Sequence, residues 1–396
     1  MKIAEPQATS RYALFDLSFR PFFLLGSMFA IISVVLWIQL YQYNLTILPD
    51  ARLTGVHWHA HEMIYGYSIV VITGFLLTAV KNWTGIQTIH SFPLLILVVI
   101  WGMARVMPYL PFNNALLVMA AFDLLFNLLV CILVLLPIAR VKQWKQMGIW
   151  SMLALLFAGN VLFYLGLFNL LDNGIRMGLY TGLYITISLI MLMGHRVIPF
   201  FIEKGVGHPV KLRDHLWINF VSIVLMLVFL VTEVYYPLPL YAAVAAISLA
   251  VIHTVRLVGW HTRGIWKKPL LWVLYIGYGW IIVGFALNAS AYFLNTDPML
   301  AVHAFAYGGI GMVTIGMMAR ISLGHTGRDV FNPPYLLGPV FLLVLVGGVV
   351  RVALPLFATQ YYNTWIFISQ LMWGLAFMMF AVYYFPILAK QPVTRE

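Results

Sequence analysis

Long apolar runs, separated by short polar stretches, recur from one end of the chain to the other. Each run holds about 17–25 residues, the length that a helix needs to cross the hydrocarbon core of a bilayer. We expect spanning helices at residues 20–42, 57–80, 91–107, 114–137, 148–168, 175–198, 215–234, 238–256, 270–293, 298–320, 335–355 and 363–388. The pattern therefore predicts an all-α polytopic membrane protein with about 12 transmembrane helices.

The composition fits a lipid environment. Of the 396 residues, 63% are hydrophobic and 9% are charged, whereas soluble domains carry about 25% charged residues. No linker interrupts the runs, and the longest expected loop covers about residues 199–214. We therefore treat residues 1–396 as a single transmembrane domain. The only cysteine, Cys131, excludes an internal disulfide.

The positive charges indicate how the chain is oriented. The formal net charge is +11, but the basic residues lie in short loops, so they do not indicate a nucleic-acid partner. If the 12 spans are drawn as above, only four of the 23 Lys and Arg residues fall on one side, namely Arg52, Arg105, Arg176 and Arg351. Because cytoplasmic loops carry the excess of Lys and Arg, both termini are expected in the cytoplasm.

Four histidines are expected at the extracytoplasmic ends of spans. His57, His59 and His61 open the second span, and His303 lies near the start of the tenth. On a helix, His57 and His61 share a face and His59 points away from them. Polar residues inside a membrane are costly and usually functional. A lone interfacial histidine is, however, more often a hydrogen-bonding residue than a ligand.

Imidazole is a strong ligand for haem iron and for copper. His61 and His303 best fit a pair that holds one haem, while His57 and His59 are candidates for copper near the outer face. Arg52 and Arg176 are candidate partners for the haem propionates. Glu62 is a candidate to orient a histidine through a hydrogen bond to its non-ligating ring nitrogen, or to relay protons.

Glycines follow His303 in the tenth span. Tyr307 and Gly308 begin a stretch that also contains Gly309, Gly311 and Gly316. Two interpretations stay open: the glycines allow close helix packing, or they leave a flat slot for a planar ligand beside His303. Elsewhere in the membrane, Asp123 is expected to pair with a buried arginine such as Arg105.

The second and tenth spans resemble each other. Both contain His-x3-Tyr-Gly-x4-Val-x2-Gly, beginning at His61 and at His303. The interval of eight spans suggests a four-helix unit used three times, in which Arg176 takes the place of the histidine in the middle copy. The match is short, and Gly and Val are common in spans.

A second group of histidines is expected at the cytoplasmic ends. His195 and His325 end the sixth and tenth spans, with Arg196 and Arg320 nearby. They are candidates for a second cofactor site, and hydrogen bonding at helix ends is the alternative.

With these residues in view, the chain resembles the NnrS family, membrane proteins described as carrying haem and copper and linked to the nitric oxide response. The resemblance is carried by the stretches Phe19–Phe23, His57–Met63, Gly194–Phe201, His303–Arg320 and Gly324–Arg328. It implies a b-type haem, copper, a bacterial inner membrane and protection against nitrosative stress, with nitric oxide as a candidate ligand. It supplies no catalytic residue and no protein partner.

Two other functions compete with this hypothesis. Haem–copper oxidases and nitric oxide reductases also have a twelve-span core with ligands on the second, sixth and tenth spans, so a quinol- or nitric-oxide-linked oxidoreductase is one alternative. A twelve-span secondary transporter is the other. The polar residues cluster near span ends, whereas a transporter site should lie near the midplane.

Overall fold

The computed structural model describes residues 13–213 and 215–393. In this part of the chain, 12 helices are long and apolar enough to cross a membrane, and no strand is present. The expected all-α polytopic fold and the number of spans are therefore confirmed.

The first six spans are formed by α1 (Phe19–Gln42), α2 (Gly55–His61) with η1 (Glu62–Ser68) and α3 (Ile69–Thr84), α4 (Ser91–Val106) with η2 (Met107–Tyr109), α5 (Ala115–Arg140), α6 (Met147–Leu167) with η3 (Trp144–Gln146), and α7 (Gly174–Gly205). The last six are formed by α8 (Leu216–Leu230) with η4 (Val231–Tyr235), α9 (Pro239–Gly259), α10 (Pro269–Phe293), α11 (Pro298–His303) with η6 (Ala304–Gly311) and α12 (Met312–His325), α13 (Leu337–Val352) with α14 (Leu354–Phe357), and α15 (Tyr362–Ala389) with η7 (Thr359–Tyr361). The short helix η5 (Arg263–Lys267) precedes α10.

The sixth span is longer than expected. Its helix α7 continues through Pro199 to Gly205, so the expected loop start at residue 199 is wrong. The apolar pattern persists there, since Ile198 and Ile202 remain buried. Gly205 also lies close against Leu271 of α10. This packing outweighs the single backbone hydrogen bond that a proline removes.

Spans 2 and 10 are built alike. Each begins with a side-chain cap, because the hydroxyl of Thr54 accepts a hydrogen bond from the backbone N–H of His57, and Asp297 accepts one from Met299. Each then changes from an α-helix to a wider π-helix directly after a histidine, at η1 and at η6. π-helical turns are rare and often mark functional sites.

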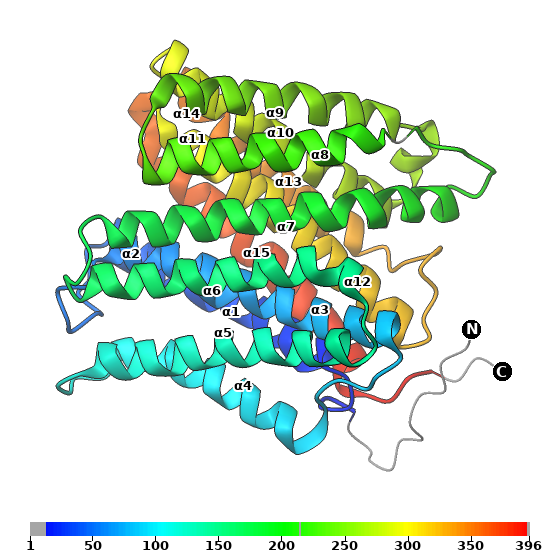
Figure 1. Cartoon of the computed structure of the whole chain (residues 1–396), viewed down its shortest axis with the longest axis horizontal. Coiled ribbons are helices and arrows are strands. Elements are labelled where there is room, and N and C mark those ends of the chain that lie inside the picture. The colour runs from blue at the N-terminus through cyan, green and yellow to red at the C-terminus, as the bar shows by residue number, and fades with distance from the viewer. Residues whose placement is uncertain (1–12, 214, 394–396) are drawn as a thin grey trace.

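The second, sixth and tenth spans lie together in the middle of the bundle (Figure 1). In spans 2 and 10, 83% and 78% of the apolar stretch is buried, against 33–61% in the other spans. The hydroxyl of Tyr67 in span 2 donates to Thr314 in span 10 over 2.7 Å, and that of Tyr65 donates to the carbonyl of Gly178 in span 6 over 2.7 Å. Spans 2, 6 and 10 are therefore neighbours in the bundle.

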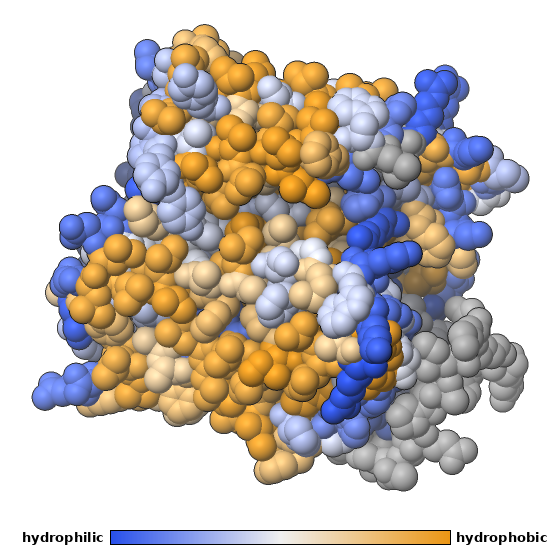
Figure 2. Space-filling view, viewed as in Figure 1, coloured by the Kyte–Doolittle hydropathy of each residue, from blue (hydrophilic) through white to orange (hydrophobic). Residues whose placement is uncertain are grey.

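The surface shows a broad apolar belt between two polar rims (Figure 2). The described chain ends lie on one side of the molecule, which we call the inner end (Figure 1). There the backbone N–H of Ala13 donates to the carbonyl of Ala389 over 2.9 Å. The opposite side, with Thr54 and Asp297, is the outer end. Which end faces the cytoplasm follows from the charge distribution alone and stays a prediction.

Candidate functional site

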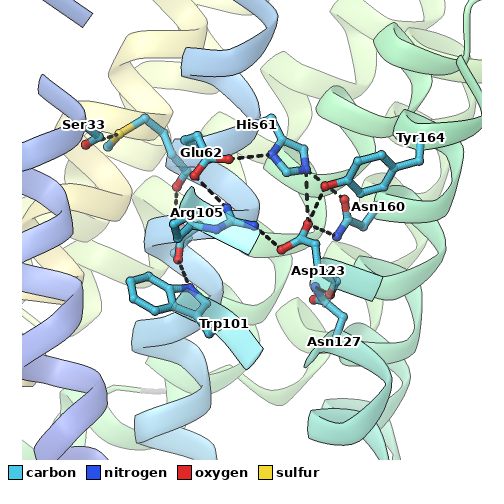
Figure 3. A network of polar contacts seen from close by, with 12 residues as sticks. Ser33, His61, Glu62, Trp101, Arg105, Asp123, Asn127, Asn160 and Tyr164 are labelled. Carbon is cyan, nitrogen blue, oxygen red and sulfur yellow. Dashed lines mark hydrogen bonds and ion pairs between the residues drawn. The ribbon is translucent and has the colours of Figure 1, made fainter. Parts of the chain in front are cut away.

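A buried ionic network connects four helices in the outer half of the bundle (Figure 3). Arg105 of α4 lies between two carboxylates: its Nη1 donates to Glu62 Oε2 over 2.7 Å, and its Nη2 donates to Asp123 Oδ1. All three side chains are at most 5% exposed. The expected pairing of Asp123 with Arg105 is confirmed.

His61 completes this network. The amide nitrogen of Asn160 donates to Asp123 Oδ2 over 2.7 Å, so the amide oxygen is left to accept from His61 Nε2 at 3.0 Å. His61 Nδ1 lies 3.1 Å from Glu62 Oε1 (Figure 3). Glu62 thus contacts a histidine, as expected for a residue that orients one. Both ring nitrogens of His61 are bonded to protein groups, and the ring is fully buried.

A second cluster lies at the outer end of span 10, around His303 and Arg351. Nδ1 of His303 lies 2.7 Å from the carbonyl oxygen of Met299, and because a carbonyl can only accept, Nδ1 carries the proton. Nε2 therefore holds a lone pair, and it accepts from Arg351 Nη2 at 3.1 Å. In this neutral tautomer Nε2 is the nitrogen that can bind a metal.

His59 faces the same cluster from span 2. Its ring stacks on Trp37, with the centroids 4.3 Å apart and the planes at 13°. It lies within electrostatic reach of both Arg351 and His303. Its Nδ1 is buried and makes no hydrogen bond with the described residues.

The two arginines occupy equivalent positions in spans that follow the two histidine spans. Gly102-x2-Arg105-Val106 in span 3 is repeated as Gly348-x2-Arg351-Val352 in span 11. In the middle unit, Arg176 of span 6 donates to the backbone carbonyls of Glu233 and Val234 in span 7 over 2.9 and 3.2 Å. An arginine therefore joins the outer ends of spans 2 and 3, of spans 6 and 7, and of spans 10 and 11.

The copies differ in how the arginine is neutralised. Arg105 has Glu62 and Asp123, whereas Ala304 stands in span 10 where Glu62 stands in span 2. Arg351 is 7% exposed, and none of the ion pairs among residues 13–213 and 215–393 includes it. Its side-chain partners are His303 and the hydroxyl of Tyr362, at 3.4 Å from Nη1.

The four outer histidines do not converge on one point. Within the described part of the chain, no group of three or more His, Cys, Asp or Glu side chains is arranged to hold a metal ion. His61 belongs to the buried network, while His59 and His303 belong to the Arg351 cluster. His57 is half-buried, and its Nδ1 has no hydrogen-bond partner among the described residues.

The other candidates of the outer end are engaged in protein contacts. The guanidinium of Arg52 is paired with Asp50 over 2.6 Å at the surface, and this hydrogen bonding holds the pKa of the Asp50 carboxyl below its usual value. Tyr307 donates to the carbonyl of Ser369 over 2.7 Å. Gly308 packs directly against the indole of Trp280. At this glycine the contacts favour the close-packing interpretation.

At the inner end, two of the four second-site candidates lie together. His325 and Arg196 line one cavity of about 360 Å³. The guanidinium of Arg320 stacks on Phe201, a third residue of this lining, at 3.8 Å from the ring centroid. His195 is not among the lining residues.

Several residues of the outer clusters, Tyr362 among them, were not singled out as site candidates from the sequence. Trp37 and Asn160 carry no motif that reveals them. Arg351 has a signal that a search for repeats finds, because its Gly-x2-Arg-Val motif lies about as far after His303 as the same motif lies after His61.

Comparison with known proteins agrees with these motifs. The family model described as NnrS protein matches residues 13–391, nearly the whole chain. No curated protein matches the sequence. The chain therefore belongs to the NnrS family.

Proposed function

We propose that this protein binds a b-type haem at the outer end of the bundle and acts in the response to nitric oxide and nitrosative stress. One observation carries the proposal: the buried Arg351 has no carboxylate partner among the described residues and donates instead to the Nε2 lone pair of His303, which an anion bound to Arg351 would release for iron. An imidazole nitrogen and an arginine that requires an anion are what the iron and the propionates of a haem need.

The neighbouring side chains fit such a group. Burying an arginine without a counter-ion is costly, and an anionic cofactor beside Arg351 would remove that cost. His59, stacked on Trp37, places a further imidazole near this site from span 2 without being needed as an iron ligand. When bound, haem iron would supply a position for a diatomic gas such as nitric oxide. His61 supports the site from the ionic network, since both its ring nitrogens are already engaged.

Copper is the second part of the proposal. His57 and His59 each have a buried Nδ1 without a described hydrogen-bond partner, and imidazole is a good copper ligand. Residues two apart on a helix point in different directions, so a single copper ion would be held by one of these two rings and not by both. We place the protein in a bacterial inner membrane with both termini in the cytoplasm.

A visible spectrum of the purified protein from haem-replete cells tests the haem proposal. We expect a Soret band that His303→Ala abolishes and that shifts when nitric oxide is added. Arg351→Met should weaken haem binding about 10- to 100-fold, because a hydrogen bond to a charged group contributes about 1.5–3 kcal/mol. His90→Ala, an exposed histidine of an inner loop, is the matched control and should leave the band unchanged.

Size-exclusion elution and helical circular dichroism would show that each variant is folded. A colourless wild-type protein, or a Soret band of full strength in folded His303→Ala, contradicts the proposal.

An oxidoreductase related to the haem–copper enzymes is a second candidate. It is favoured by the central position of spans 2, 6 and 10, which those enzymes share. The middle unit weighs against it, because Arg176 stands where a ligand histidine would be needed. Consumption of nitric oxide with a quinol donor, lost in His303→Ala, would establish this candidate in place of a binding role.

A further inference from the structure

Spans 2, 6 and 10 line a partly open cavity at the inner end, far along the bundle from the histidine clusters. It measures about 360 Å³, at the small end of the range of ligand pockets. Span 2 contributes Thr78, Asn82 and Trp83, span 6 contributes Arg196 and Phe201, and span 10 contributes His325, each among other lining residues. The proposed haem protein makes no use of this cavity.

The polar lining of the cavity is basic or neutral. No Asp or Glu belongs to the lining. Arg196 is exposed, with Nη1 donating to Gln146 over 3.2 Å, so its remaining N–H groups can reach a ligand. His325 is half-buried, and its ring packs against Phe19 with the centroids 5.7 Å apart. The charges of Lys81 and Arg20 lie within electrostatic reach of this ring.

The remaining lining is apolar and largely aromatic. Phe75, Trp83, Phe200 and Phe201 contribute rings, and Met193 and Met317 contribute thioethers. The guanidinium of Arg320 lies on Phe201 at 3.8 Å, so it adds positive charge directly behind one wall. Arg320 itself is 9% exposed. Apolar walls with a few convergent polar groups are the usual form of a small-molecule site.

We propose that this cavity binds an organic anion with an apolar body. The anionic head, a carboxylate, sulfonate or phosphate, pairs with Arg196 and His325, and the body lies between the aromatic rings and the two methionines. Two family-motif stretches thereby gain a role, because Arg196 lies in Gly194–Phe201 and His325 in Gly324–Arg328. The site is separate from the proposed haem site and does not depend on it.

Photolabelling of the full-length protein in detergent micelles tests this site. The probe is 4-benzoylbenzoate, an aromatic carboxylate whose excited benzophenone inserts into nearby C–H bonds, those of methionine above all. We expect saturable labelling of peptides that contain Met193 and Met317. In Arg196→Gln/His325→Gln the concentration for half-labelling should rise about tenfold or more, because two charge-assisted contacts are lost.

Two controls separate this site from general partition into the micelle. Lys267→Gln removes a basic residue of the same inner end that does not line the cavity, and should label like the wild type. Neutral benzophenone has the same apolar body without the anion, and should label these two peptides weakly and without saturation.

Competition identifies the source of the ligand. Displacement of the probe by water-soluble 2-naphthoate but not by phosphatidylglycerol indicates a soluble anion. Displacement by phosphatidylglycerol but not by phosphatidylcholine indicates an anionic lipid. Either result supports the site. The proposal is overturned if the probe labels other peptides instead. It is also overturned if neutral benzophenone labels as strongly as 4-benzoylbenzoate, or if the double variant is labelled like the wild type.

Discussion

Arg105 and Arg351 show how one side chain acquires different roles from its neighbours. Both stand in a Gly-x2-Arg-Val motif at the outer end of a span, and both are at most 7% exposed. Arg105 neutralises two buried carboxylates, whereas Arg351 is bonded to neutral groups. The sequence predicted the pairing of Arg105 with Asp123, because few buried residues of opposite charge were available.

The partners of Arg351 were harder to predict. They depend on how deep His303 lies and on where its ring points, and helical spacing alone gives neither. Helical spacing separated His59 from His57 and His61, as the structure also does. It did not separate His57 from His61, which differ because Glu62 and Asn160 hold only the deeper ring.

This difference predicts unequal losses of stability. Arg105→Met leaves Glu62 and Asp123 buried without their cation and should cost about 3–5 kcal/mol of unfolding free energy. Arg351→Met, the matched variant, removes a cation that has no described counter-ion, and should cost far less in the haem-free protein. Thermal unfolding in detergent, followed by circular dichroism, measures both. Equal losses would show that the two sites are electrostatically alike.

At the scale of the element, the spans were predictable and their irregularities were not. Runs that are apolar on every side give the length of a helix but not its pitch, so the π-helical turns η1 and η6 left no trace in the pattern. The continuation of α7 past Pro199 was missed because a proline beside basic residues resembles a loop, although Ile198 and Ile202 keep the packing pattern.

Close packing of spans 5 and 6 predicts a strong effect at one glycine. A methyl group on Gly178 of α7 would come within 2.4 Å of the backbone nitrogen of Phe163 in α6. Gly178→Ala should therefore cost about 1–3 kcal/mol, as overpacking usually does. Gly102→Ala, where nothing lies within 4 Å, is the control and should be neutral or stabilise α4 by up to about 1 kcal/mol. Melting temperatures compare the two, and a harmless Gly178→Ala would contradict the packing.

At the scale of the whole molecule, 12 spans bring the described chain ends to one side (Figure 1). The sequence predicted this arrangement, since an even number of spans returns the chain to its starting side. It also predicted the face that carries most Lys and Arg. The grouping of spans 2, 6 and 10 was only suggested by the weak repeat, because a sequence match does not reveal which helices touch.

The orientation can be tested with single cysteines. Cys131 is buried, so Cys131→Ala provides a thiol-free background. In it, Asp172→Cys, in the exposed outer loop before α7, should react with a membrane-impermeant maleimide on spheroplasts. Arg263→Cys, exposed at the inner end, should react only after permeabilisation. The reverse pattern would place the termini outside.

The π-helical turns of spans 2 and 10 have a consequence for how such a site changes over time. A π-turn holds more residues than an α-turn, and one residue corresponds to about 100° of rotation about the helix axis. Loss of a single residue inside η1 or η6 would therefore rotate the preceding histidine about the helix axis. The glycine-packed remainder of the span would keep its register. The direction in which each histidine points can thus change in evolution without a change in the helix packing of the bundle.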